Sequence, residues 1–288
     1  MLKDPSKLRG LHMNSREIKS ILKRCGVKPS RRLGQNFLIN TQIIKREIDY
    51  AEITKKDVVL EVGGGLGCLT RALAERAKLV YTVEVDRRLA QFLQNHLSTF
   101  NNVEVINADF LKIDPPAFNK LVSNPPYSIS APLIFKIARL NFDKAVLTLQ
   151  LEFALRLVAS PGSKEYGRLS VSAQTYFNIT ILEIVDKKNF YPIPKVDSAI
   201  VLLTPKPAEI DEHLFSEVSR CLFTTPNRKV KYGLLLLFER LNLPKNHLLQ
   251  LLNESPLSEK RSRHLTPDEV KKLTFWVEGI LHERKENR

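Results

Sequence analysis

The order of apolar and polar positions predicts strands that alternate with helices over residues 57–150. Short apolar runs rich in β-branched residues predict buried strands in "DVVLEV", "LVYTVEVD", "VEVINADF", "FNKLVS" and "KAVLTLQ". Between them, "LTRALAERA", "RRLAQFLQNHL" and "APLIFKIARL" repeat apolar residues at helical spacing. Strands and helices that alternate in this way favour a parallel, doubly wound α/β sheet with right-handed crossovers.

The segments outside this alternation predict the rest of the architecture. Two helices are expected before the first strand, and the runs "FNITILEIVD" and "DSAIVLLTP" are expected to form an antiparallel pair at one edge of the sheet. After Pro205-Lys206-Pro207 only helical patterns follow, in "LFSEVSRCLF", "GLLLLFERL", "HLLQLLN" and "TPDEVKKLTFWVEGIL". We therefore expect an unstructured leader at 1–13, an α/β domain with N-terminal helices at 14–206 and a small all-helical domain at 207–288.

A large excess of positive charge indicates a polyanionic partner. The formal net charge is +14 and the pI is about 9.7, and such a surface binds phosphates with release of counterions. Basic residues recur at 28–32, 227–231 and 260–264, which favours a broad nucleic-acid surface over a single charged tail. A basic surface that binds nothing is the alternative.

The sequence gives no indication of secretion, membrane insertion or a metal site. The leucine run at 234–237 is too short to span a bilayer, and no apolar segment follows the early lysines. The cysteines Cys25, Cys68 and Cys221 lack metal-ligand spacing and are expected to be reduced. We therefore expect a cytoplasmic protein.

A glycine-rich turn follows the first strand of the alternation. Gly63, Gly65 and Gly67 would bring backbone N–H groups and a helix N-terminus close to a ligand. Glu84 ends the next strand, where an acid can hold ribose hydroxyls. The G-x-G-x-G spacing favours S-adenosylmethionine over a dinucleotide, because the third glycine of the dinucleotide pattern would fall at Cys68 and S-adenosylmethionine has no pyrophosphate. A tight turn without a ligand is the alternative.

A further acid, Asp109, ends the third strand in "NADF". A carboxylate at this place can accept a hydrogen bond from an adenine amino group. The same residue type also caps turns, and its position in a nucleotide-type sheet favours the binding role.

The stretch "NPPY" (124–127) ends the fourth strand and predicts the chemistry. An exocyclic amine such as adenine N6 is a poor nucleophile, because its lone pair is delocalised into the ring. The Asn124 side-chain oxygen and the Pro125 carbonyl would orient the amine and stabilise its developing positive charge. Proline stiffens the turn and offers no competing N–H, and Tyr127 offers a face for a flipped-out base. A strand terminator with a packed tyrosine is the alternative.

Together these motifs resemble the family of ribosomal RNA adenine-N6 dimethyltransferases, from about residue 28 to residue 205. The motifs that carry the resemblance are "LGQNFL", "EVGGGLGCLT", "VEVD", "NADF", "NPPYSIS", "SKEYGRLSV" and "FYPIPKVDSAIV". The resemblance implies a Rossmann-like, S-adenosylmethionine-dependent methyltransferase sheet. It also implies dimethylation of N6 of two adjacent adenines in the 3′-terminal hairpin of small-subunit rRNA. The implied partner is an immature small ribosomal subunit, and a monomer is expected.

The resemblance also implies roles for single residues. The cofactor-binding residues are expected in the "LGQNFL" motif and at the strand ends: Gln35, Asn36, Leu38, Gly63, Gly65, Glu84, Asp109 and Asn124. The residues expected to bind and stack the target base are Asn124, Pro125, Tyr127 and Phe190. Contacts with RNA are expected from basic residues: Arg31, Arg32, Arg168, Arg228, Lys229 and Lys231. For Arg168, in the "YGRLS" loop, a role in bracing the active-site loop is equally open.

Three features depart from the pattern of the family. The family usually has leucine or isoleucine in place of Pro125, and "NPPY" is commoner in enzymes that methylate DNA adenine or protein glutamine. This leaves the second methylation open. Proline is usual in place of Gly64, and "TTPNRKVKYGL" is closer to archaeal or eukaryotic members than to bacterial ones.

Other functions stay open at the level of sequence. They are methylation of a large-subunit rRNA adenine, a non-catalytic ribosome assembly or transcription factor on the same fold, and a DNA methyltransferase. The "FYPIPKVDSAIV" segment and the helical domain favour the small-subunit enzyme. Intact Glu84, Asp109, Asn124 and Tyr127 argue against a pure binding protein. A DNA enzyme would usually carry a larger target-recognition domain.

Overall fold

The computed structural model describes residues 15–29, 34–243, 251–252 and 254–286. The chain divides into two compact units, one of residues 1–154 and 179–205 and the other of residues 155–178 and 206–288. The sequence analysis assigns 155–178 to the α/β domain, whereas their contacts place them with the C-terminal helices. The expected leader at 1–13 lies outside the described residues, as does most of "HLLQLLN".

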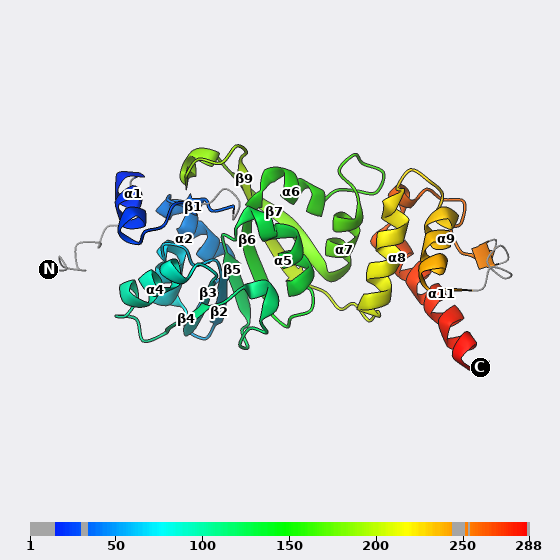
Figure 1. Cartoon of the computed structure of the whole chain (residues 1–288), viewed down its shortest axis with the longest axis horizontal. Coiled ribbons are helices and arrows are strands. Elements are labelled where there is room, and N and C mark those ends of the chain that lie inside the picture. Colours follow the sequence, from blue (N-terminus) through cyan, green and yellow to red (C-terminus); the bar gives the residue numbers. More distant parts are fainter. Residues whose placement is uncertain (1–14, 30–33, 244–250, 253, 287–288) are drawn as a thin grey trace. The chain divides into compact units, whose positions relative to one another are not determined.

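The first unit is built on a seven-stranded sheet in the order β4-β3-β2-β5-β6-β9-β7 (Figure 1). The pairs β2–β3, β3–β4, β2–β5 and β5–β6 are parallel, and β9 is antiparallel to β6. The predicted α/β fold, with two later strands at one edge, is therefore confirmed. The strands are β2 (Val58–Val62), β3 (Leu79–Glu84), β4 (Val103–Asn107), β5 (Lys120–Ser123), β6 (Lys144–Gln150), β7 (Phe177–Val185) and β9 (Ser198–Pro205).

Helices cover both faces of this sheet (Figure 1). Val59 and Val122 pack in one apolar cluster with residues of α2 and α3. Leu60 and Leu121 point to the opposite face and are also fully buried. The helical elements of this unit are α1 (Ser15–Arg24), α2 (Thr41–Tyr50), α3 (Cys68–Arg76), α4 (Arg87–His96), η2 (Phe110–Lys112), η3 (Tyr127–Ile129), α5 (Ser130–Ile137) and η4 (Lys187–Asn189), and α6 (Leu151–Leu157) begins in it.

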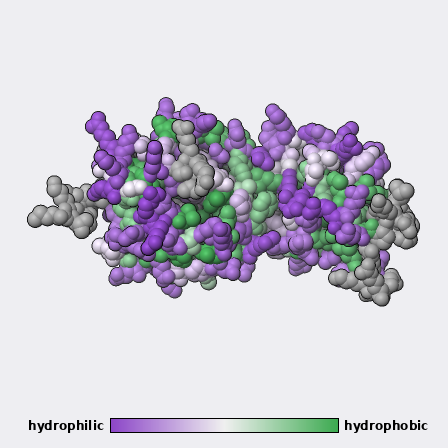
Figure 2. Space-filling view, viewed as in Figure 1, coloured by the Kyte–Doolittle hydropathy of each residue, from purple (hydrophilic) through white to green (hydrophobic). Residues whose placement is uncertain are grey.

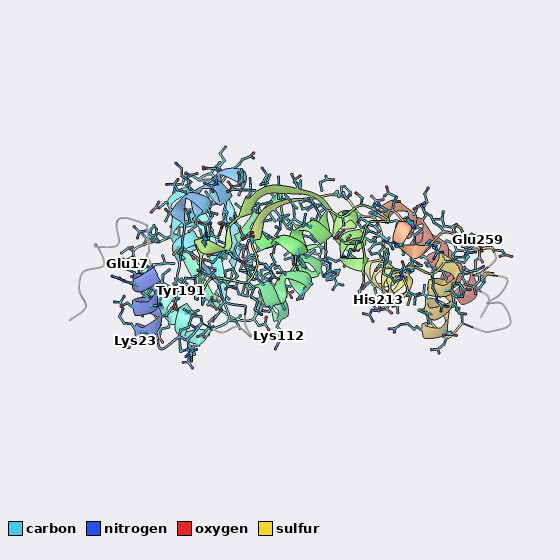
Figure 3. All side chains as sticks on the ribbon, turned by 90° about the horizontal axis from the view of Figure 1, so that it is seen from above. Glu17, Lys23, Lys112, Tyr191, His213 and Glu259 are labelled. Carbon is cyan, nitrogen blue, oxygen red and sulfur yellow. The ribbon has the colours of Figure 1, made fainter. Side chains whose placement is uncertain are left out.

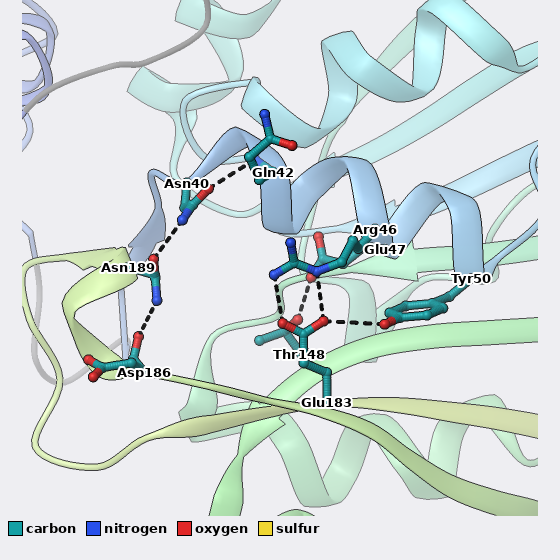
Figure 4. A network of polar contacts seen from close by, with 9 residues as sticks. All are labelled: Asn40, Gln42, Arg46, Glu47, Tyr50, Thr148, Glu183, Asp186 and Asn189. Carbon is teal, nitrogen blue, oxygen red and sulfur yellow. Dashed lines mark hydrogen bonds and ion pairs between the residues drawn. The ribbon is translucent and has the colours of Figure 1, made fainter.

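Polar contacts lock α2 onto the sheet (Figure 4). The Arg46 guanidinium donates two hydrogen bonds to the Glu183 carboxylate of β7, at 2.6 and 2.7 Å. The Tyr50 hydroxyl donates to the same carboxylate at 3.3 Å. On the neighbouring face of the helix, the Thr148 hydroxyl of β6 donates to Glu47. These contacts fix the rotation of α2 about its axis, so Glu47 points into the protein.

A second, two-stranded sheet joins segments far apart in the sequence. β1 (Phe37–Leu38) pairs antiparallel with β8 (Phe190–Tyr191). Tyr191 also lies near α1, with the Lys19 ammonium 5.9 Å from its ring centroid (Figure 3). Sequence patterns do not predict this sheet, because two residues are too few to show a periodicity.

The second unit is helical (Figure 1). Its core includes Phe215, Leu234, Phe238 and Leu273, all fully or nearly fully buried. Its elements are α7 (Arg168–Tyr176), α8 (Glu212–Thr224), α9 (Val230–Arg240), η5 (Ser262–His264) and α11 (Pro267–Glu286).

The last helix of the second unit begins with a side-chain cap at Thr266. The Glu269 N–H donates to the Thr266 hydroxyl at 3.2 Å, and the Glu269 carboxylate accepts from the Thr266 N–H at 2.8 Å. These reciprocal bonds form a capping box, which gives hydrogen-bond partners to N–H groups that the helix itself leaves unpaired. The "YGRLS" segment is not a loop throughout, because Arg168 begins α7.

One glycine permits the close approach of α8 and α9. A Cβ on Gly233 would lie 2.8 Å from the Leu222 Cα and 3.2 Å from the Cys221 carbonyl oxygen. We predict that Gly233→Ala lowers the free energy of unfolding by about 1–3 kcal/mol, because overpacking outweighs the better helix propensity of alanine. Denaturant unfolding measures the change.

The matched control is Gly279→Ala in α11, where a Cβ meets nothing within 4 Å. This exchange is expected to stabilise the protein by about 0.5–1 kcal/mol. Equal effects of the two exchanges would contradict the packing assigned to Gly233.

Candidate active site

A pocket lies at the carboxyl ends of the central strands of the first unit, where open α/β sheets bind their ligands. Leu38 lines a smaller adjoining pocket, which shares five lining residues with the main one: Asn36, Phe37, Gly63, Gly65 and Asn124. The predicted cofactor residues that line the main pocket are Gln35, Asn36, Gly63, Gly65, Glu84, Asp109 and Asn124. The fold thus brings together residues that the sequence spreads over a long span.

The glycine turn after β2 forms one wall of the pocket. Gly63 and Gly65 have φ of 86° and 54°. Residues that carry a side chain adopt this region of φ only at an energetic cost. A Cβ on Gly65 would lie 3.1 Å from the Phe37 ring. The Gly65 N–H donates to the Glu84 carboxylate at 2.9 Å, and so ties the turn to the end of β3.

The two predicted acids present their carboxylates to the same pocket. Glu84 is 4% exposed, accepts a second N–H from Asp86 at 2.9 Å, and has its pKa raised by burial. Asp109 caps η2 by accepting from the Leu111 N–H at 3.0 Å, and its other oxygen is 3.8 Å from the Lys112 ammonium. Asp109 therefore both caps η2 and lines the pocket.

The "LGQNFL" segment packs against the loop that follows β5, at Tyr127 and Ser128. Gly34 has φ of 64°, and a Cβ there would lie 2.9 Å from the Ser128 N–H nitrogen. The Asn36 amide donates to the Gly34 carbonyl at 3.2 Å. Leu38 then pairs with Phe190, which fixes the far end of the segment. Residues 34–38 are thus held at both ends while Gln35 and Asn36 face the pocket.

Asn124 follows β5 directly and lies beside the glycine turn. The preceding Ser123 hydroxyl donates to the Val62 carbonyl at 2.6 Å, which ties β5 to the end of β2. The Asn124 amide nitrogen donates to the Glu47 carboxylate at 3.2 Å. Its side-chain oxygen Oδ1 is buried and finds no hydrogen-bond partner among the described residues. An unpaired buried acceptor is costly, so it marks the place where a ligand N–H is expected.

The other residues of the predicted base site differ in exposure. Pro125 is buried and is absent from the pocket lining, whereas Pro126 lines the pocket and its carbonyl accepts from the Ile129 N–H at 3.0 Å. Tyr127 is half-buried, and its hydroxyl is 2.6 Å from the Ser198 hydroxyl. Phe190 is 2% exposed and packs in the core. Its stacking role stays a prediction.

Two buried acids escaped the sequence analysis. Glu47 and Glu61 are each 1% exposed, and burial raises the pKa of each to about 7. Thr70 donates to Glu61 at 2.6 Å. The signal was present in the sequence, since Glu47 falls on the same helical face as Ile44 and Ile48, and Glu61 interrupts an apolar strand. A carboxylate at such a position is rarely buried without a partner.

The pocket fits S-adenosylmethionine. The Glu84 carboxylate can accept hydrogen bonds from a ribose diol, and Asp109 can accept one from an adenine amine. The apolar side chains of Val85, Phe110 and Ile129 line the same pocket and suit the faces of a purine. Among the described residues, no group of acids, histidines and cysteines could hold a metal ion, and no described helix is long and apolar enough to cross a membrane.

A basic surface forms where two separate sequence segments meet in the second unit. The Ser262 N–H donates to the Arg228 carbonyl at 3.0 Å, and the Val230 N–H donates to the Lys260 carbonyl at 2.8 Å. Segments 227–231 and 258–264 therefore lie side by side. We call the positively charged residues of these segments the basic surface: Arg228, Lys229, Lys231, Lys260, Arg261 and Arg263.

Most cations of this surface already have partners in the protein. Lys229 and Lys231 both pair with Glu259, which is exposed (Figure 3), and the Arg228 guanidinium lies 5.3 Å from the Tyr232 ring centroid. Arg168 donates to the Ser216 hydroxyl at 3.1 Å. Arg31 and Arg32 lie outside the described residues. The RNA contacts stay predictions, and Figure 2 shows hydrophilic side chains spread over each unit.

The fold and the pocket define a class of protein. A Rossmann-like sheet, a glycine turn, an acid at the end of the next strand and an N-P-P-Y loop belong to an S-adenosylmethionine-dependent methyltransferase, so the chain is an enzyme of this class. The chain belongs to the ribosomal RNA adenine dimethylase family, whose model matches residues 26–274.

Relatives and solved structures agree with this membership. A protein of Pyrococcus abyssi described as a probable ribosomal RNA small subunit methyltransferase A is 44% identical, over 89% of this chain and 95% of the relative. One of Methanopyrus kandleri with the same description is 40% identical, over 89% and 95%.

Two crystal structures resemble the chain over most of their length. A dimethyladenosine transferase from Plasmodium falciparum matches with a TM-score of 0.72 and 33% identity, over 81% of this chain and 94% of that one. The 23S rRNA methyltransferase ErmE matches with a TM-score of 0.60 and 30% identity, over 84% and 99%.

The geometry of the glycine turn predicts a sensitive position for cofactor binding. We expect Gly65→Ala to weaken S-adenosylmethionine binding by about tenfold or more, because the positive φ costs about 1–2 kcal/mol and the new methyl group displaces the Phe37 ring. Titration calorimetry measures the dissociation constant.

Gly167→Ala is the control, since a Cβ there meets nothing within 4 Å and its backbone is extended. It should leave the affinity as it is. A Gly65→Ala protein that binds the cofactor as tightly as the parent would contradict the assignment of this turn.

Proposed function

We propose that this enzyme transfers methyl groups from S-adenosylmethionine to N6 of two adjacent adenines in the 3′-terminal hairpin of small-subunit rRNA. The unpaired Oδ1 of Asn124, buried at the end of β5 beside the glycine turn, carries the proposal. A target that presents an N–H group satisfies this acceptor, whereas a ring nitrogen that carries no hydrogen does not.

The residues of the site would act on the amine by orientation and by charge. Bound S-adenosylmethionine supplies an electrophilic methyl group. Asn124 Oδ1 and the Pro125 carbonyl would accept the two amine hydrogens, aim the nitrogen lone pair and stabilise the positive charge that forms on nitrogen. Tyr127 would stack on the base, with its ring fixed through Ser198. A dedicated base is unnecessary, because the methylated amine is strongly acidic and loses its proton to water.

The departure at Pro125 is compatible with a second methylation. After the first transfer the amine keeps one hydrogen, which one of the two acceptors can still hold. The Pro125 side chain is buried and is not among the residues that line the pocket. Exchange of leucine or isoleucine for proline therefore removes no side chain from the lining of this pocket, and it stiffens the turn.

The choice of the small subunit rests on the named relatives. Proteins that cover most of the chain at 40–44% identity are described as small subunit methyltransferases, and the 23S rRNA enzyme resembles the chain at a lower TM-score than the dimethyladenosine transferase does. Methylation of a large-subunit adenine is the second candidate, since the 23S enzyme also covers most of the chain.

The charge of the protein supports an RNA partner of some size. A net charge of +14 and the basic surface of the second unit suit a structured polyanion. We propose that the chain acts as a monomer in the cytoplasm on an immature small subunit, and that the basic surface, with Arg31, Arg32 and Arg168, contacts its RNA.

The substrate is tested by offering labelled methyl donor with immature small ribosomal subunits, naked rRNA or DNA. We predict label on adenine N6 of the small-subunit rRNA 3′ hairpin, and more label on the particle than on naked RNA. Label only on large-subunit RNA would favour the second candidate. Label only on DNA, or on no nucleic acid, would exclude the proposed function.

The role of Asn124 is tested with Asn124→Ala. We expect transfer to fall by about 100-fold or more, because the acceptor that orients the amine and stabilises its charge is lost. Binding of S-adenosylmethionine, measured by calorimetry, should change by less than about threefold. An equal loss of both would show instead that Asn124 maintains the pocket and does not act on the target.

A further inference from the structure

We propose that Glu47 is a positioning residue, whose buried carboxylate holds the Asn124 amide in the one orientation that turns Oδ1 to the target amine. The inference rests on the proposed function and deepens it, because it names the group that sets the catalytic loop. Glu47 lies on α2, far in the sequence from the motifs of the site, and it lines neither the main pocket nor its neighbour.

Glu47 makes side-chain hydrogen bonds with two neighbours, Asn124 and Thr148. One carboxylate oxygen accepts from the Asn124 amide nitrogen at 3.2 Å, and the other accepts from the Thr148 hydroxyl. The side chain is 1% exposed, so water does not compete for these bonds. The adjacent Arg46–Glu183 pair fixes the helix that carries Glu47 (Figure 4).

The primary amide of an asparagine can rotate by half a turn about its last side-chain bond. This rotation exchanges the positions of its oxygen and nitrogen with little change of shape. With the nitrogen turned to the pocket, Asn124 would present N–H donors to an amine that also donates, and no acceptor would face the target. An ionised carboxylate offers acceptors only, so it binds the nitrogen end of the amide and leaves Oδ1 for the target. Glu47 thus selects the reactive orientation, and the buried unpaired Oδ1 is the consequence.

The surroundings of Glu47 make this selection depend on pH. The charged groups that interact with its carboxylate are Glu61 on β2, Glu183 on β7 and Arg46 on its own helix. Burial, with a smaller contribution from the two acids, raises the pKa of Glu47 to about 7, and the bonds from Thr148 and Asn124 oppose the rise.

The charged groups of the elements packed around α2 have other partners. Arg76 on α3 pairs with Asp49, Lys120 on β5 donates to the Ala51 carbonyl, and Lys144 on β6 pairs with Glu52. The Glu47 carboxylate is therefore surrounded by two acids and one arginine that is already engaged by Glu183.

The sign of the pH dependence follows from the carboxyl group. Above the raised pKa the carboxylate is ionised and accepts from the Asn124 nitrogen. Below it the carboxyl carries an O–H, which can donate to Asn124 Oδ1 and stabilise the turned amide. The rate of transfer should therefore rise with pH through about 7, while binding of the methyl donor should not follow the same curve.

The test compares Glu47→Ala, Glu47→Gln and the control Asp49→Asn on the full chain, with small ribosomal subunits as substrate. Asp49 is an acid of the same helix that pairs with Arg76 at the surface. In Glu47→Ala we expect kcat to fall by about tenfold or more, with donor binding and the melting temperature measured beside it. In Glu47→Gln we expect recovery to within about threefold of the parent at pH 8, because glutamine keeps an acceptor for Asn124, and loss of the rise of kcat near pH 7.

Asp49→Asn should keep both the rate and the pH profile of the parent. Glu47→Ala with unchanged kcat, or Glu47→Gln with an unchanged rise near pH 7, would overturn the inference. If alanine at 47 unfolds the protein, the pH profile of Glu47→Gln decides alone. A parent that methylates no adenine under any condition would refute the proposed function, whereas a parent that does so and is indifferent to residue 47 would refute only the role of Glu47.

Discussion

The active site depends on the junction of β2 and β5 at the middle of the sheet. Their parallel pairing brings two turns to one edge, the glycine turn at Gly63 and the Asn124 turn, and the Ser123 hydroxyl joins the strands by its bond to the Val62 carbonyl. Pro126 packs against Gly63, where an added Cβ would lie 3.1 Å from its ring. A cofactor bound at the glycine turn and a base bound at Asn124 would therefore lie next to each other.

Polar contacts made by buried groups then set the details at this junction. Glu84 holds the glycine turn from β3 through the Gly65 N–H, and Glu47 holds the Asn124 amide from α2. Both carboxylates lie almost out of reach of water, where a hydrogen bond is stronger and an unpaired group more costly than at the surface. Glu84 and Asn124 both line the pocket where the cofactor and the target are expected.

Much of the fold and of the pocket could be predicted from the sequence, because both follow local rules. The alternation of apolar strands with helices fixed the class of sheet, and parallel strands place their carboxyl ends together, which is why Gly63, Glu84, Asp109 and Asn124 meet in one pocket. The capping box of Thr266 and Glu269 is local in the same way, because the two residues lie three positions apart.

The parts that escaped prediction depend on contacts between distant segments. The pairing of residues 37–38 with 190–191 has no periodicity of its own, and the bond from Asn124 to Glu47 joins residues 77 positions apart. Likewise, residues 155–178 join the helical unit through tertiary packing that the order of elements does not show. Phe190 lies in the core with Leu38, and its role at the target base stays a prediction.

A structure of the enzyme with a bound methyl donor analogue and an adenine nucleotide would show whether Asn124 binds the target amine. The quantity to measure is the distance from Asn124 Oδ1 to the adenine N6. We predict a hydrogen bond of about 2.7–3.2 Å, with the Asn124 amide nitrogen still bonded to the Glu47 carboxylate. An adenine amine that lies away from Asn124, or that faces its amide nitrogen, would contradict it.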